Sequence, residues 1–202
     1  MILTMINNSF VLGAPQLPFG APEFGKPVAA PAPSPSQHVP PHANRRALSF
    51  AADHGGCGFW RIHWPEAIIN GNSLGSCSNM TFMLTDQRFY EGLKSVKVQR
   101  QVTPPQAEFV KFLRQMADKF KFKLYYEIDD VVFCEDIPLY NKARDAFTDP
   151  VIKKTAIEIM KMCDAITCPT KFMGEYYTSR VGTPHIVLPN YMPKFWIDRY
   201  YS

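Results

Sequence analysis

Short apolar runs alternate with longer segments along residues 47–190, and the two kinds of segment repeat with different periods. The short runs are rich in β-branched and aromatic residues, which is typical of β-strands, whereas the longer segments carry an apolar residue every three or four positions, as amphipathic helices do. The pattern predicts strands at 47–51, 79–84, 95–100, 122–128, 165–168 and 185–188. It predicts helices at 59–70, 104–120, 141–147, 170–180 and from 150 onward, with a short helix or turn at 86–93.

Alternating strands and helices favour a parallel sheet covered by helices, because a parallel connection needs a crossover that is usually helical. We therefore expect an α/β fold, a Rossmann-like parallel sheet with helices on both faces, over residues 47–202. Pro104 and Pro105 open the clearest amphipathic helix, and its apolar stripe predicts a side that faces the core.

Residues 1–46 differ in composition from the rest of the chain. They contain nine of the 18 prolines, with Ala, Ser and Gly between them and almost no charge before Arg45 and Arg46. Such a segment buries too little apolar surface to offset its ordering entropy, which predicts a disordered Pro/Ala-rich tail. The apolar start lacks a basic region, so we expect no signal peptide, and no run approaches the ~18 apolar residues of a membrane span.

The net charge bears on nucleic-acid binding, and the cysteine content bears on the cellular compartment and on zinc binding. The net charge of +4 is too small to indicate nucleic-acid binding by itself, although a local basic face is not excluded. The five cysteines are odd in number, scattered and without a neighbouring histidine cluster, which predicts reduced thiols in a cytoplasmic protein and no zinc site.

A glycine-rich loop follows the first predicted strand. Gly55, Gly56 and Gly58 would let backbone N–H groups approach a phosphate or a sugar at the start of the next helix, or they form only a tight turn. The spacing is not the dinucleotide fingerprint, which needs G-x-G-x-x-G. Arg61 and His63 follow within one helical turn, either as ligands of an anion in the cleft or as a surface arginine and a packed histidine.

Two adjacent acids, Asp129 and Asp130, end the strand predicted at 122–128. Ligands of open α/β sheets bind at the carboxyl ends of strands, so these acids are candidates for a general base, an acceptor of sugar hydroxyl groups or a metal ligand. The alternative is an N-cap or Asx-turn. Adjacent side chains usually diverge, so we expect at most one carboxylate to face a cleft. Arg100, at the end of another strand, is either a phosphate or hydroxyl ligand or a solvated edge residue.

Taken in order, these motifs resemble the N-terminal, acceptor-side domain of GT-B-fold glycosyltransferases of the group-1 (family 4) kind. The resemblance covers about residues 47–202 and rests on Gly55–Pro65, Gln99–Gln101, Tyr126–Phe133 with Ile137 and Pro138, Cys163–Thr167 and Leu188–Asn190. The motif around Asp129 and Asp130, followed by residues 137–141, is also similar to enzymes encoded by large bacteriophages. That similarity implies the cytoplasm of a bacterial host.

The resemblance implies transfer of a sugar from a nucleotide-sugar, without a metal or another cofactor. It would place Gly56 and Gly58 near the donor phosphates or the transferred sugar, with Arg61 supporting their loop. One of the two acids would lie on the acceptor side of the cleft, and Asn190 would mark the run toward the interdomain hinge.

The donor-binding half of such enzymes should follow Asn190, but the chain has only 12 further residues. We therefore expect that half to be on another polypeptide or missing, and the chain alone to be inactive, with its acceptor unidentified. Two alternatives stay open: a non-catalytic binding or scaffold module derived from such a domain, and an unrelated nucleotide-binding α/β domain.

Overall fold

The computed structural model describes residues 46–53, 55–71, 77–80, 83–133, 139–141, 144, 148–190 and 198. The predicted tail, 1–46, therefore lies outside the described residues except for Arg46, and so does most of the helix predicted at 141–147. Within the described part, no helix is both long enough and apolar enough to cross a membrane.

Six strands form one fully parallel sheet, in the order β2-β1-β3-β4-β5-β6. The strands are β1 (Ala47–Phe50), β2 (Cys77–Met80), β3 (Ser95–Gln99), β4 (Lys123–Glu127), β5 (Ala165–Cys168) and β6 (His185–Val187). The helical elements are α1 (Gly56–Gly58), η1 (Phe59–His63), α2 (Trp64–Gly71), η2 (Gln87–Tyr90), α3 (Pro104–Phe120), α5 (Pro150–Lys161) and α6 (Lys171–Val181). This is the predicted α/β fold, a Rossmann-like parallel sheet.

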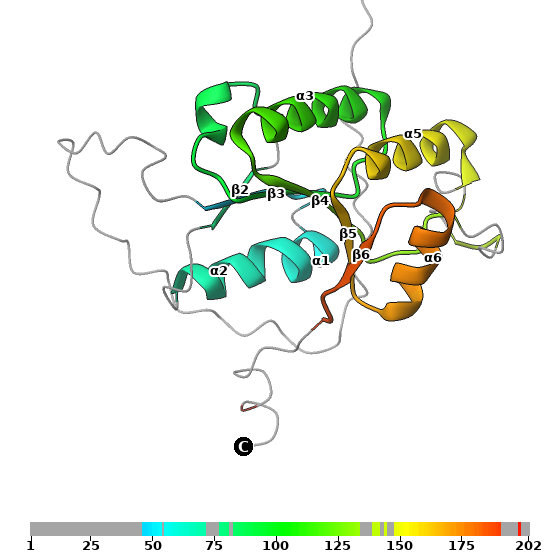
Figure 1. Ribbon diagram of the computed structural model, residues 1–202. Helices are drawn as coiled ribbons and strands as arrows, with labels where there is room; N and C mark the ends of the chain where they lie inside the picture. The colour runs from blue at the N-terminus through cyan, green and yellow to red at the C-terminus, as the bar shows by residue number, and fades with distance from the viewer. Residues whose placement is uncertain are drawn as a thin grey trace, which may run out of the picture. The chain divides into compact units, whose positions relative to one another are not determined.

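Helices cover both faces of the sheet, as expected. Figure 1 shows α1 and α2 on one side of the sheet and α3 and α5 on the other. The chain turns from β1 to β2 in one direction and then crosses to β3 on the other side of β1. The reversal leaves a topological switch point between β1 and β3, where doubly wound sheets bind their ligands.

Local sequence signals set the ends of α3 and α5, the two helices that lie on the same side of the sheet (Figure 1). α3 begins after Thr103, and the side-chain oxygen of Gln106 accepts a hydrogen bond from Thr103 N at 2.9 Å, as in a capping box. It ends at Lys121 in the left-handed conformation, with φ at 62°. Asp149 caps α5, whose Pro150 needs no N–H donor in the first turn.

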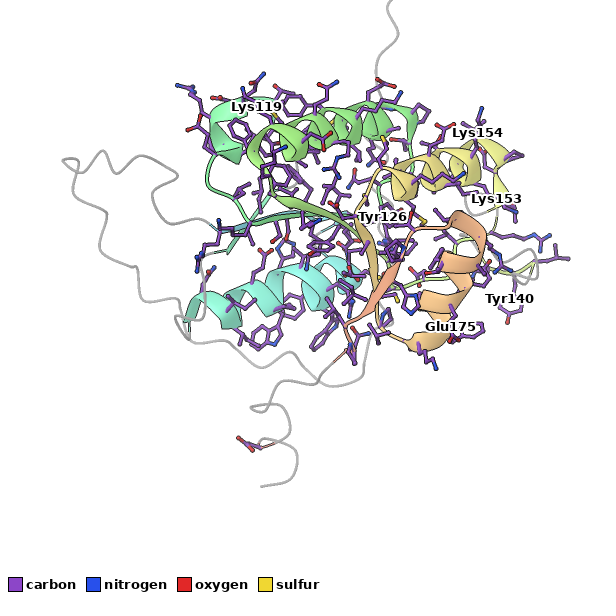
Figure 2. All side chains as sticks on the ribbon, viewed as in Figure 1. Lys119, Tyr126, Tyr140, Lys153, Lys154 and Glu175 are labelled. Atoms are coloured by element: carbon purple, nitrogen blue, oxygen red, sulfur yellow. The ribbon has the colours of Figure 1, made fainter. Side chains whose placement is uncertain are left out.

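Side chains from the sheet and from α3, α5 and α6 form the core. The predicted stripe of α3 is buried at Phe109, Leu113, Met116 and Ala117. Tyr126 of β4 is completely buried, and Figure 2 shows it in the interior beside the sheet, whereas Lys119 and Lys154 lie at the outside of their helices. The hydrophobic pattern therefore predicted the faces of the main elements correctly.

Two elements differ from the prediction by more than one residue. The strand predicted at 79–84 is found at Cys77–Met80, where it pairs with β1 from Ala47 opposite Cys77 to Phe50 opposite Met80, and residues 81–82 lie outside the described part of the chain. The helix predicted to begin at residue 59 begins at Gly56, for a reason that lies in the loop after β1.

Candidate functional site

Loops from three neighbouring strands meet at the carboxyl edge of the sheet beside the switch point. They follow β1, β3 and β4, which are adjacent and parallel, so their ends lie at the same edge. Every residue that the sequence predicted for the site follows one of these strands or β6. The topology therefore brings most of the predicted residues into one region.

The loop after β1 is organised by Asp53. Its Oδ1 accepts hydrogen bonds from the N–H groups of Gly55, at 2.8 Å, and Gly58, at 3.1 Å. A carboxylate that binds the free N–H groups of a first turn stabilises a helix there, which explains why the helix starts at Gly56 and takes Gly56 and Gly58 out of the predicted open loop. Any residue larger than glycine at position 58 would require the backbone to shift, because its Cβ would lie 1.8 Å from the carbonyl oxygen of Asp53.

The helix continues from α1 into a π-helical segment, η1, before α2. Such segments are rare and often occur at functional sites. In this segment Phe59 is 40% exposed to solvent and Trp60 is 41% exposed. His63, a predicted ligand, instead points back toward its own loop, with Nε2 at 3.3 Å from the carbonyl oxygen of Asp53.

Arg100 joins the three loops. Its guanidinium forms an ion pair with Asp53 at 2.6 Å and another with Asp130 at 2.9 Å. The backbone of Arg100 is in the left-handed region, with φ at 44°, and its N–H donates to the carbonyl of Glu127. A non-glycine residue in that conformation costs about 1 kcal/mol or more and is commonest at functional sites. Arg100, at the end of its strand, therefore connects two carboxylates through ion pairs and is not a solvated edge residue.

Gln99 gives the same loops a second connection. Its side chain is buried, accepts a hydrogen bond from Ala52 N at 3.0 Å and donates one to the carbonyl oxygen of Cys57 at 3.0 Å. The sequence marked Gln99 only as a neighbour of Arg100. A buried side-chain amide with two backbone partners has a positioning role that periodicity alone does not reveal.

Asp129 and Asp130 approach the same point. Donor atoms of Cys57, Asp129 and Asp130 all lie within 4.8 Å of one another. The two carboxylates lie close to each other, and the expectation that at most one of them faces a cleft stays a prediction. Tyr177 holds the loop after β4: its hydroxyl donates to the carbonyl oxygen of Asp130 and accepts from Val132 N.

Cys57 was not predicted as a site residue, and neither was Asp53. Burial, together with the neighbouring carboxylate of Asp129, raises the pKa of the Cys57 thiol to about 12. The Oδ1 atom of Asp129 is buried and has no hydrogen-bond partner. Buried carboxylate oxygens are normally satisfied, so this atom distinguishes Asp129 from the neighbouring Asp130, whose Oδ2 is paired with Arg100. Asp130 is more open, with 45% of its side chain exposed.

Arg61, predicted as an anion ligand, is buried inside the protein. Its Nε donates to Glu127 at 2.7 Å, and the two side chains are 5% and 1% exposed. Its NH1 donates to the carbonyl oxygen of Leu188 and, at 2.8 Å, to Oδ1 of Asn190. The other carboxylate oxygen of Glu127 accepts from Thr167. Arg61 and Asn190 thus contact each other, as part of a buried network that links η1 to β4 and to the residues after β6.

A small hollow of about 90 Å³ lies next to this edge. It is lined by Phe50, Ala51, Ala52, Met83, Gln101, Gln106 and Phe109. Ala51 and Ala52 directly precede Asp53, so the hollow adjoins the polar cluster. Its mixed apolar and amide lining would suit a small neutral group of a ligand whose polar part reaches the carboxylates.

No protein-family model and no curated protein matches this chain. The fold gives its class: it is a Rossmann-like α/β protein, with a cluster of carboxylates at the carboxyl edge of its sheet.

Proposed function

We propose that this domain is the acceptor-binding half of a cytoplasmic GT-B-type glycosyltransferase that uses a nucleotide-sugar donor. The motifs at Gly55–Pro65, Tyr126–Phe133 and Leu188–Asn190 resemble that family in sequence. The observation that carries the proposal is the convergence of Asp129 and Asp130 on one point at the carboxyl edge of the sheet. Ionised carboxylates are acceptors only, so they suit a ligand that offers hydroxyl groups, such as a sugar or another polyol.

The charge at this edge supports a hydroxyl-bearing acceptor over a phosphate. Among the residues that the structure describes, Asp53 and Asp130 both form ion pairs with Arg100, and Asp129 adds a third carboxylate nearby. Asp53 also accepts hydrogen bonds from two N–H groups at the start of the helix, those of Gly55 and Gly58, which could otherwise bind an anion. The donor diphosphate would meet repulsion here, so we assign it to a second domain that faces this edge.

In this proposal Asp129 serves as the acceptor-side base or hydroxyl ligand. Arg100 holds Asp130 beside it, and the hollow next to Asp53 takes a neutral part of the acceptor. Arg61 and Asn190 act structurally, by fixing the chain where it leaves β6. Developing charge on the leaving nucleotide would be stabilised by the second domain.

The proposal is tested by gentle purification from the native source and mass spectrometry of what accompanies the chain. We expect a stoichiometric chain, or a longer form of this one, that carries a nucleotide-sugar-binding domain. The purified assembly is then given radiolabelled nucleotide-sugars, and transfer to any co-purifying material is measured. Asp129→Asn should lower transfer by about 10²-fold or more, the usual range for an acid–base group. Asp86→Asn, which alters a partly exposed acid at the start of η2, should not.

Robust transfer by the isolated 202-residue chain would contradict the assignment of the donor to another domain. Recovery of the chain alone, together with unchanged biological activity of the Asp129→Asn variant, would favour the non-catalytic binding module instead. A tight dinucleotide complex of the isolated chain would favour the unrelated nucleotide-binding domain.

A further inference from the structure

A thiol and two carboxylates converge at the switch-point edge, from two segments far apart in the sequence. Cys57 comes from α1, and Asp129 and Asp130 come from the loop after β4. Their donor atoms lie within 4.8 Å of one another. In a tetrahedral zinc site, with bonds of about 2.0 to 2.3 Å, neighbouring ligand atoms are about 3.5 Å apart. Side-chain movements of about 1 Å would bring the three ligand atoms from this spacing to that of a zinc site.

A second observation at the same place indicates a missing partner. Oδ1 of Asp129 is buried and accepts no hydrogen bond. Leaving a buried carboxylate oxygen without a partner costs about 1 to 3 kcal/mol, and more for a charged group, unless a ligand satisfies it. Proteins tolerate such atoms mainly where something binds.

The surrounding charges are compatible with a cation. Arg100 lies nearby, but Asp53 and Asp130 already form ion pairs with it, and Asp129 adds a further carboxylate. Arg100 binds Oδ2 of Asp130 and so fixes the orientation of that carboxylate, as outer-shell partners of metal ligands commonly do. Asp130 is 45% exposed, which leaves room for a water ligand from solvent.

We propose that Cys57, Asp129 and Asp130 form a binding site for a thiophilic divalent cation, of which Zn²⁺ is the best match. A sulfur ligand selects against Mg²⁺ and Ca²⁺, which prefer oxygen, and three protein ligands with an open fourth position are typical of catalytic rather than structural zinc. On binding, the thiol proton of Cys57 passes to solvent and the thiolate coordinates the metal. The cation satisfies Asp129 and leaves a solvent position beside Asp130.

This site differs from the metal-free expectation for the resembled family, and it does not depend on the proposed transferase activity. Metal binding is measured on the isolated chain without any sugar, so its outcome is independent of the transfer experiment. The sequence did not predict the site, because Cys57 and Asp129 are 72 residues apart and no local spacing connects them.

The test is a titration of the reduced, metal-free full chain with Co²⁺, a spectroscopic substitute for Zn²⁺, followed by displacement with Zn²⁺. We expect one equivalent to bind and to produce a near-ultraviolet absorption band from thiolate-to-cobalt charge transfer, which Zn²⁺ abolishes. Cys57→Ser should remove the band. Asp129→Asn and Asp130→Asn should each raise the Kd about tenfold or more. Cys163→Ala and Asp86→Asn, which alter a core thiol and a partly exposed acid elsewhere, are the matched controls and should bind as the parent does.

Circular dichroism of each variant separates loss of the site from loss of the fold. Absence of the band in the folded parent chain would overturn the proposal, and so would a band that survives in Cys57→Ser. If the Cys57→Ser variant does not fold, the Asp130→Asn variant provides the test, because the side chain of Asp130 is 45% exposed and lies outside the hydrophobic core. An unchanged Kd in that variant would exclude the three-residue site.

Discussion

The buried pair of Arg61 and Glu127 yields the sharpest prediction from this structure. Replacing either partner with methionine should destabilise the domain strongly, because the other charge would stay buried without compensation. The exposed fractions of the two side chains are only 5% and 1%. Breaking such a pair costs about 3 to 5 kcal/mol. That is a large part of the total stability of a domain, which is about 5 to 15 kcal/mol.

The magnitude depends on which contacts each substitution removes. Arg61→Met also removes hydrogen bonds to Leu188 and Asn190, so we expect it to cost more than Asn190→Ala, which removes one hydrogen bond to a charged group, worth about 1.5 to 3 kcal/mol. At about 2 to 4 °C per kcal/mol for a domain of this size, Arg61→Met should lower the Tm by about 6 to 20 °C.

The assay is urea unfolding followed by far-ultraviolet circular dichroism, in a double-mutant cycle of Arg61→Met and Glu127→Met. The double variant should be clearly more stable than the sum of the single losses predicts, with a coupling of about 1 to 3 kcal/mol, because it leaves neither charge alone. Arg88→Met, which breaks the exposed pair with Asp86, is the control and should leave the midpoint unchanged. The reasoning is refuted if Arg61→Met behaves like Arg88→Met, or if the cycle is additive.

Three further predictions concern the first glycine loop, one carboxylate and one buried thiol. Gly58→Ala should destabilise the domain by about 1 to 3 kcal/mol, since the new Cβ overlaps backbone, whereas Gly56→Ala, with nothing within 4 Å, should be neutral or slightly stabilising in urea unfolding. Asp164 is partly buried, which alone would raise its pKa, but hydrogen bonds from Leu124 N and the Arg114 guanidinium hold that pKa below 3.8. Asp164→Asn weakens these hydrogen bonds and should therefore lower the free energy of unfolding by about 1.5 kcal/mol at neutral pH. Burial raises the pKa of the Cys163 thiol to about 12, so iodoacetamide at pH 8 should alkylate it only after unfolding, as mass spectrometry of the peptides would show.

Each of these has an outcome that would contradict it. Equal stability of the Gly58→Ala and Gly56→Ala variants would mean that the loop after β1 is free to move. The stabilisation from Asp164 is complete above its unfolded pKa of 3.8 and is lost as the pH falls through the lower folded value, so a difference between parent and variant that persists in strong acid would exclude the mechanism. Rapid alkylation of Cys163 in the native protein would show that α5 opens locally.

The fold could be predicted largely from the sequence because its signals are local. The stripe of α3, Thr103 before its two prolines, and Asp149 before Pro150 are all readable within one or two helical turns. The start of the first helix was misplaced because its first turn is stabilised by Asp53, which lies before the N-cap Gly55 and accepts a hydrogen bond from Gly58 N five residues later. The bounds of β2 were misplaced because pairing with β1 decides them.

The candidate site was predictable only in part. Strand ends identified Asp129, Asp130 and Arg100, since ligands of parallel sheets bind at carboxyl edges whatever the sequence. The same reasoning could not distinguish Arg100 from Arg61, because both are basic residues near a strand end. Burial beside Glu127 makes Arg61 structural, and that partner lies 66 residues away.

The sequence by itself determined the class of fold and the faces of its helices, and it predicts the edge at which a ligand would bind, because periodicity, caps and strand ends are properties of neighbouring residues. Only the tertiary structure decided the chemistry at that edge. It brought Cys57 to Asp129 and Asp130, and it neutralised Arg100 between two carboxylates. The physical reason is that charge interactions and metal coordination depend on distances of a few ångströms, and for residues from different strands those distances are set by packing of the sheet and not by separation along the chain.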